Sequence, residues 1–125
     1  MTQGITIEEA QKICQKLNQT FKSGKTLSYY YRIEQLTALQ NLLSENTERL
    51  CKALHDDLGK PAFEASLCEI DLLTKEVIET KRNLHHWMAP EPAERDIATM
   101  VNTLEKRRDP MGLTLILGAW NYPIV

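Results

Sequence analysis

The feature that most constrains the fold is a short apolar run near the end of the chain. Residues 113–117 read Leu-Thr-Leu-Ile-Leu, and Gly112 and Gly118 stand at the two ends of the run. A short apolar run with branched side chains, bounded by glycines, is typical of a strand that is buried on both faces in a parallel sheet. We therefore predict a buried strand over residues 113–118.

Residues 120–123, Trp-Asn-Tyr-Pro, follow this run almost directly. In open α/β sheets ligands bind beyond the carboxyl ends of the strands, which is where these residues would lie. Pro123 lacks a backbone N–H and biases Tyr122 away from the helical region, so we expect the chain to turn here. Asn121 could then aim its side-chain amide at a ligand, or it could simply cap the turn, as asparagine often does.

Upstream of this run, apolar residues recur at helical spacing. We expect a first helix over residues 5–22, because Thr6 followed by Glu9 fits a capping box that satisfies free N–H groups of the first turn. A second helical stretch covers residues 28–58. Asn46 is the weak point of this stretch, because its side chain can cap a new helix.

A third helix is predicted over residues 61–88. Gly59 suits the position after one helix, and Pro61 suits the first position of the next. Acidic residues share the surface of this helix with its apolar stripe. Glu69 and Asp71 are two positions apart and point in different directions, so we interpret the acidic residues as a solvated face and not as paired catalytic carboxylates.

The segment after the third helix is expected to be extended. Two prolines in residues 89–92 end the helix, and residues 97–108 predict one or two extended segments. The basic run 106–108 could form a phosphate-binding patch or an exposed strand edge, where Lys and Arg discourage aberrant pairing. We favour the strand edge.

Composition and charge exclude several classes of function. The chain is 42% hydrophobic and 26% charged, and its net charge of −2 gives no basic field for nucleic acid. Its apolar runs are far shorter than the ~20 residues of a membrane span. Cys14, Cys51 and Cys68 form no CxxC pattern, which predicts reduced thiols in the helical core and no metal site.

The end of the chain also carries a family resemblance. Residues 118–123, Gly-Ala-Trp-Asn-Tyr-Pro, follow Pro-Met-Gly at 110–112 and the apolar run. This combination resembles the NAD(P)-dependent aldehyde dehydrogenases. Tyr122 stands where other branches have phenylalanine, which is similar to the class 3, or fatty-aldehyde, branch.

A second stretch supports the same resemblance. Asp-Leu-Gly-Lys-Pro at 57–61, followed by Phe-Glu-Ala at 63–65 and Glu-Ile at 69–70, resembles the helix junction of that branch. The resemblance covers nearly the whole chain, from about residue 8 to residue 125. It implies an α/β fold in which N-terminal helices lead into the first strands of a Rossmann-like cofactor domain. Residues 1–125 would be the N-terminal, incomplete and mostly helical part of that domain.

The resemblance also implies a chemistry. Enzymes of this family oxidise an aldehyde to a carboxylic acid with NAD or NADP: a cysteine thiolate attacks the carbonyl, hydride passes to the cofactor, and a glutamate activates the water that releases the acid. Asn121 matches the residue whose amide stabilises the oxyanion. Gly118, Ala119 and Trp120 match positions near the adenosine ribose of the cofactor, and Tyr122 matches a position that lines the aldehyde tunnel.

The nucleophile and the base of the family lie downstream of the matched strand, so none of the cysteines of this chain matches the nucleophile. We expect the chain alone to be inactive and the full-length protein to be a homodimer, paired partly through the region of residues 97–108. The alternative is a helical interaction or oligomerisation module, or an inactive truncated isoform. We expect a cytoplasmic protein, with any membrane attachment made through a segment C-terminal to Val125.

Overall fold

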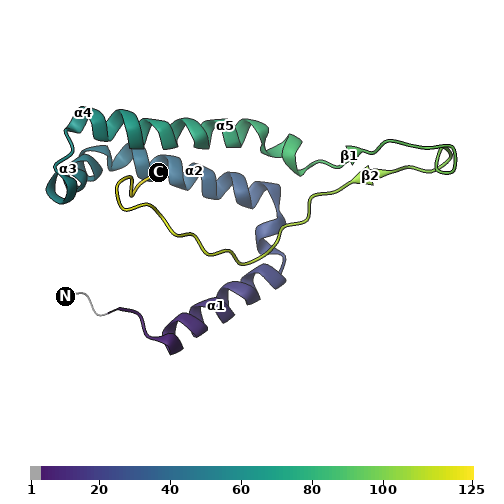
Figure 1. The fold of residues 1–125 in the computed structure, drawn as a ribbon, viewed down its shortest axis with the longest axis horizontal. Coiled ribbons are helices and arrows are strands. Elements are labelled where there is room, and N and C mark those ends of the chain that lie inside the picture. The colour runs from purple at the N-terminus through teal and green to yellow at the C-terminus, as the bar shows by residue number, and fades with distance from the viewer. Residues whose placement is uncertain (1–3) are drawn as a thin grey trace.

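The computed structural model describes residues 4–125, which form a group of helices, a two-stranded hairpin and an extended C-terminal segment (Figure 1). No described helix combines the length and the apolar character needed to cross a bilayer. The elements in chain order are α1 (Ile7–Lys22), η1 (Lys25–Leu27), α2 (Tyr29–Glu45), α3 (Thr47–Leu58), α4 (Ala62–Ala65), the π-helical turn η2 (Ser66–Ile70), α5 (Asp71–Met88), β1 (Glu91–Pro92) and β2 (Glu105–Lys106).

Helix α1 begins with the predicted capping box. The backbone N–H of Glu9 donates to the Thr6 hydroxyl oxygen over 3.2 Å, and the backbone N–H of Thr6 donates to Glu9 Oε2 over 2.9 Å. These two bonds satisfy donors that would otherwise be free in the first turn. The apolar stripe of α1 has no buried residue, however, and Cys14 is exposed. The expectation of a core position for Cys14 is therefore wrong, because no described element buries the part of α1 that carries it.

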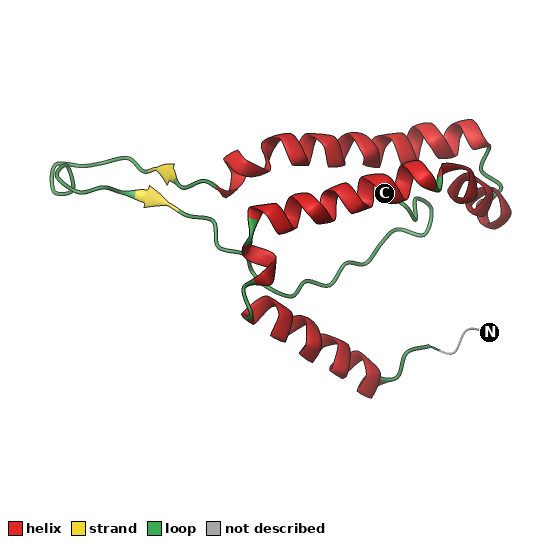
Figure 2. Cartoon of the chain, turned by 180° about the vertical axis from the view of Figure 1, so that it is seen from behind, coloured by secondary structure: helices red, strands yellow, loops and turns green. Residues whose placement is uncertain are grey.

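Helices α2 and α5 lie side by side and form the main packing unit, as both Figure 1 and Figure 2 show. The Tyr29 ring meets the His85 ring edge-on at 5.7 Å, and Lys81 Nζ donates to Gln40 Oε1 over 3.1 Å. Burial of each large aliphatic side chain contributes roughly 1.5–3 kcal/mol relative to an exposed one. The buried apolar residues are Leu43, Leu54, Ala65, Ile70, Val77 and Leu84.

The second helical stretch breaks at Asn46, as its sequence predicted, and α3 begins at the next residue. The mechanism differs from the expected one, because the Asn46 side chain makes no capping bond to α3. Its Nδ2 donates to the Leu42 carbonyl oxygen over 2.9 Å, and its Oδ1 accepts from Arg49 over 2.7 Å. The amide thus ties together the helices on either side of the break.

The junction before the third helix follows the prediction at Gly59 but not at Pro61. Gly59 ends α3 with φ +68°, and its N–H donates to the His55 carbonyl oxygen over 2.9 Å. A positive φ of this kind favours glycine, which has no Cβ to clash. Pro61 precedes the first turn of α4 and is not part of it. From α4 the chain stays helical to the end of α5, with the π-turn η2 inserted.

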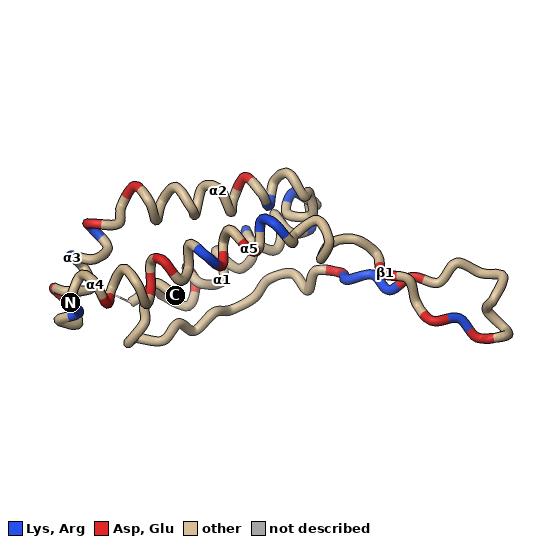
Figure 3. The backbone as a smooth tube through the Cα atoms, turned by 90° about the horizontal axis from the view of Figure 1, so that it is seen from above, with Lys and Arg blue, Asp and Glu red and all other residues tan. Residues whose placement is uncertain are grey.

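The hairpin replaces most of the extended region expected over residues 97–108. Strands β1 and β2 pair antiparallel, and residues 97–102 form the turns and bend at the hairpin tip. The turn forms because the Asp96 carboxylate accepts from the Thr99 backbone N–H over 2.8 Å, while the Thr99 hydroxyl accepts from the Asp96 N–H over 2.9 Å. Charged residues of both signs lie along this arm, which points away from the helices (Figure 3).

The basic run after the hairpin is engaged in exposed ion pairs. Lys106 is exposed in β2, in line with the expected strand edge. Arg108 Nη2 lies 2.5 Å from Glu91 Oε1, and Arg107 Nη2 lies 3.1 Å from Glu105 Oε2. These neighbouring carboxylates partly neutralise the run, which further favours the strand edge over a phosphate patch.

Residues 113–118 do not form the predicted buried strand. They run alone as an extended segment, drawn as loop throughout in Figure 2, and Ile116 is 85% exposed. A strand needs a neighbour to pair its backbone N–H and C=O groups, and no described strand lies beside this segment. The described chain is accordingly mostly helical with one two-stranded sheet, and the expected parallel sheet is not formed.

We expect the isolated 125-residue chain to self-associate through residues 113–117, because an exposed apolar segment with branched side chains pairs readily with a second copy. Ile116→Lys should raise the concentration at which aggregates appear in light scattering. The matched control is Ile97→Lys, because Ile97 is 91% exposed but lies in the hairpin turn. Equal protection by both substitutions, or a cooperatively melting wild-type monomer, would contradict this prediction.

The capping box of α1 should respond to acid. Hydrogen bonds from the backbone N–H and the hydroxyl of Thr6 hold the pKa of Glu9 below its ordinary value of 4.5. A depressed carboxyl pKa means that the stabilisation is present above the ordinary value and is lost as pH falls through the folded-state value. The Thr6 amide, which donates to this carboxylate, should then lose protection from hydrogen exchange, as measured by NMR. Glu9→Gln should abolish this acid transition, and Glu8→Gln should retain it.

Candidate functional site

A buried ion pair lies where the helices meet the C-terminal segment. The side chain of Glu69 has no exposed surface, and that of Lys60 is 11% exposed. Lys60 Nζ donates to Glu69 Oε1, and the other carboxylate oxygen, Oε2, accepts from the backbone N–H of Ile124 over 3.0 Å. Within residues 4–125 no buried side-chain nitrogen or oxygen lacks a partner, so this pair is fully satisfied.

Lys60 has two further contacts, both with the Trp-Asn-Tyr-Pro turn. Its Nζ donates to the backbone carbonyl oxygen of Asn121 over 2.7 Å and lies 3.9 Å from the centre of the Tyr122 ring. The second contact is a cation–π geometry, which is stronger when the cation is removed from water. One ammonium group therefore joins the helix junction to two residues of the predicted site.

The position of Glu69 depends on the π-turn η2. The backbone N–H of Asp71 donates to the carbonyl oxygen of Ser66, which is the five-residue spacing of a π-helix. Within this wider turn both Glu69 and its neighbour Ile70 are buried. The interpretation of Glu69 as part of a solvated face is therefore wrong, although Asp71 is exposed as expected.

Sequence reasoning missed Lys60 and Glu69 as site residues. One signal was available, because Glu69 lies four residues before Leu73 and eight before Val77, on the apolar stripe of the third helix. An acid on such a stripe needs a buried partner. The identity of that partner, which lies beyond the π-turn and the Gly59 turn, was not evident from spacing.

The structure brings only part of the predicted site together. Asn121 and Tyr122 meet Lys60, while Gly118, Ala119 and Trp120 are exposed. The Asn121 side-chain amide makes no hydrogen bond to any described residue. It is exposed beside a shallow cavity of about 320 Å³ whose other lining residues are Leu58, Gly59, Lys60, Pro61 and Glu64.

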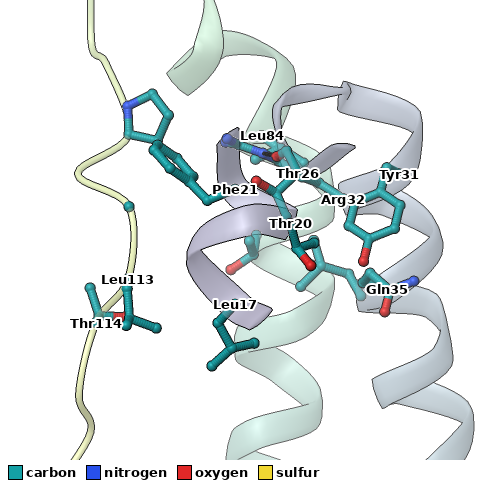
Figure 4. A pocket seen from close by; sticks show the side chains of 14 residues that line it. Leu17, Thr20, Phe21, Thr26, Tyr31, Arg32, Gln35, Leu84, Leu113 and Thr114 are labelled. Atoms are coloured by element: carbon teal, nitrogen blue, oxygen red, sulfur yellow. Dashed lines mark hydrogen bonds between the residues drawn. The ribbon is translucent and has the colours of Figure 1, made fainter. Parts of the chain in front are cut away.

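A larger apolar cavity of about 600 Å³ lies elsewhere, between α1, α2, α5 and residues 110–114 (Figure 4). Gly112, with φ +100°, allows a close approach here, because an added Cβ would lie 3.3 Å from the Phe21 ring. Arg32 donates from Nε to the Thr26 carbonyl oxygen over 2.8 Å. No cysteine, histidine or carboxylate lines this cavity, and none of the predicted site residues reaches it. Its lining is mainly apolar, with hydroxyl groups from Tyr31 and several threonines.

The described residues hold no evident metal ligands, because no three His, Cys, Asp or Glu side chains gather within 4–125. The cysteines are unpaired: Cys14 is exposed, and Cys51 and Cys68 are half-buried. None of the three lines the cavity beside Asn121. The site therefore offers an amide donor and a buried ion pair, and it contains no thiol within that cavity.

Comparison with known proteins decides the family. The family model described as "Aldehyde dehydrogenase family" matches residues 2–125. The chain belongs to the aldehyde dehydrogenase family. This match confirms the resemblance predicted from the Gly-Ala-Trp-Asn-Tyr-Pro motif and the Asp-Leu-Gly-Lys-Pro junction.

Curated relatives point to one branch of the family. The chain is 41% identical over 110 residues to mouse aldehyde dehydrogenase family 3 member B3, and 42% identical over 110 residues to mouse member B1. It is 35% identical over 117 residues to member H1 of family 3 from Arabidopsis thaliana. These matches cover 88%, 88% and 94% of this chain but only 23%, 24% and 24% of the relatives. The chain thus spans about a quarter of their length.

The backbone of Gly59 is expected to matter for the junction that presents Lys60. Gly59→Ala should lower the free energy of unfolding by about 1–2 kcal/mol, because a side chain is strained at positive φ. Urea denaturation measures this loss. Gly4→Ala is the matched control, because Gly4 lacks a positive φ and an added Cβ has open space at both glycines. An equal effect at both positions would contradict the prediction.

Proposed function

We propose that the complete protein oxidises aldehydes to carboxylic acids with NAD or NADP, and that this chain supplies its oxyanion-stabilising residue, Asn121. Family membership over residues 2–125 supports the reaction class. The assignment of Asn121 rests on the different contacts of its backbone and its side chain. Its backbone carbonyl oxygen is held by Lys60, while its side-chain amide is exposed and has no partner among the described residues.

The proposed chemistry uses this free amide. When a thiolate adds to an aldehyde, the planar carbonyl becomes a tetrahedral adduct with negative charge on its oxygen. A neutral N–H donor held in place stabilises that charge more than it stabilises the planar substrate. The amide nitrogen of Asn121 is such a donor. It would hydrogen-bond to the developing oxyanion while its own backbone stays fixed.

The thiolate and the base are proposed to come from parts of the protein outside these residues. Cys14 is exposed in α1, and Cys51 donates over 3.9 Å to the Ala62 carbonyl oxygen and lines a different cavity. None of the cysteines lines the cavity beside Asn121. We therefore propose that the chain alone is inactive.

The residues before Asn121 fit one part of the proposed cofactor. A Cβ added at Gly118 would meet nothing within 4 Å, and Trp120 is 83% exposed, so this backbone is open to a ligand. Gly118, Ala119 and Trp120 would then approach the neutral adenosine ribose. When bound, the cofactor accepts the hydride that leaves the substrate. The ring of Tyr122, steadied over Lys60, would line the aldehyde path.

Two further expectations become proposals for the complete protein. A homodimer would pair partly through the hairpin arm, which extends away from the helices and is exposed along β2 (Figure 1). The cytoplasmic location rests on the unpaired cysteines, which suit a reducing compartment.

The alternative function, a helical interaction module, is supported by the apolar face of α1, which has no buried residue. The family match over residues 2–125 favours the enzyme.

Asn121→Ala in the complete protein tests the proposed function. Loss of one oxyanion donor should lower kcat on the order of 10²–10³-fold, because the donor acts mainly in the transition state. Steady-state kinetics of NAD(P)H formation at 340 nm would measure this loss. Asn41→Ala, at an exposed position of α2, is the control and should leave kcat unchanged. Full turnover in Asn121→Ala would show that the amide has no such role.

A further inference from the structure

We propose that Lys60 and Glu69 form a positioning clamp that fixes the direction in which Asn121 presents its side-chain amide. Neither residue is proposed to touch the aldehyde or the cofactor. The clamp acts through the backbone of the turn, so this inference rests on the function proposed for Asn121.

The clamp makes the principal polar link between the turn and the helices. In the described chain, the hydrogen bonds that join residues 113–125 to the helices are those from Lys60 Nζ to Asn121 and from Ile124 to Glu69. The partners are 61 and 55 residues apart in sequence. The segment just upstream gives no support, because Leu115, Ile116, Leu117 and Trp120 are all exposed.

These two hydrogen bonds fix the backbone of the turn on either side of Pro123. Lys60 holds the carbonyl oxygen of Asn121, and Glu69 holds the N–H of Ile124. Between these points the peptide groups are planar and Pro123 fixes its own φ, so few backbone conformations remain. The Tyr122 ring lies against Lys60 Nζ and removes a further degree of freedom. The peptide plane that contains the Cα of Asn121 is thereby held, which limits the directions in which its side chain can leave the backbone.

Because the clamp is an ion pair, single and double substitutions of its residues should affect stability differently. The Glu69 carboxylate accepts on both oxygens, and the Lys60 ammonium has three distinct partners. Removing one partner leaves an uncompensated buried charge, which destabilises the fold. Replacing both by apolar residues of similar size removes that penalty. The double replacement keeps the core filled but cannot hold the carbonyl of Asn121.

The test compares three variants of the complete protein: Lys60→Met, Glu69→Gln, and the double variant Lys60→Met/Glu69→Leu. Each should lower kcat by about 10²-fold, the order expected for a misplaced catalytic group, and leave the KM for the cofactor unchanged. The double variant should lose kcat although its fold is intact. Lys60→Arg, which keeps a charged donor, should recover part of the lost rate.

A double-mutant cycle separates positioning from a general structural role. If Lys60 acts through the amide of Asn121, adding Lys60→Met to Asn121→Ala should cause no further loss of kcat. A full additional loss in that background would overturn the clamp. The control is Lys52→Met, which breaks the exposed i,i+4 pair of Lys52 and Asp56 on α3 and should leave kcat unchanged.

Hydrogen exchange gives a readout that does not depend on activity. The Ile124 amide should exchange faster in the double variant, while the amides of α5 keep their protection. An unchanged Ile124 amide would overturn the clamp. Normal turnover in Lys60→Met beside a slow Asn121→Ala would overturn the clamp alone and leave the proposed function standing. Full turnover in Asn121→Ala would overturn both.

Discussion

The ammonium group of Lys60 lies between the carboxylate of Glu69, the carbonyl oxygen of Asn121 and the face of the Tyr122 ring. The carboxylate comes from the π-turn, and the carbonyl oxygen and the ring both come from the C-terminal turn. The ion pair is almost fully withdrawn from water. A buried charge tolerates few arrangements, because each hydrogen bond that it loses leaves a desolvated group unpaired. This requirement couples the helix junction, the π-turn and the C-terminal turn into one unit.

Outside this unit the packing is uneven. Helices α2 and α5 share a buried stripe, whereas α1 and residues 113–117 leave apolar side chains exposed. The chain spans about a quarter of the length of its curated relatives. The site follows the same pattern. Lys60 and Glu69 anchor the backbone of the turn, whereas Trp120 and the other outward side chains of this region are exposed.

Much of the helical structure could be predicted from local signals. The Thr6–Glu9 capping box, the break at Asn46 and the glycine at the end of α3 each act within a few residues, so sequence alone located them. The candidate site was predicted in part. The motif and the family resemblance predicted a role for Asn121, which stays a prediction. The ion pair that holds its backbone was overlooked, since a charged residue is usually found at the surface.

Sequence by itself determined the helix boundaries and the family, because both depend on residue types at short, fixed spacings. Tertiary structure alone decided three other features: the burial of Glu69, the exposure of Cys14 and the failure of residues 113–118 to form a strand. Each of these depends on which other segment lies opposite. An acid is buried only if a cation reaches it, an apolar face only if another element covers it, and a strand forms only beside a second strand.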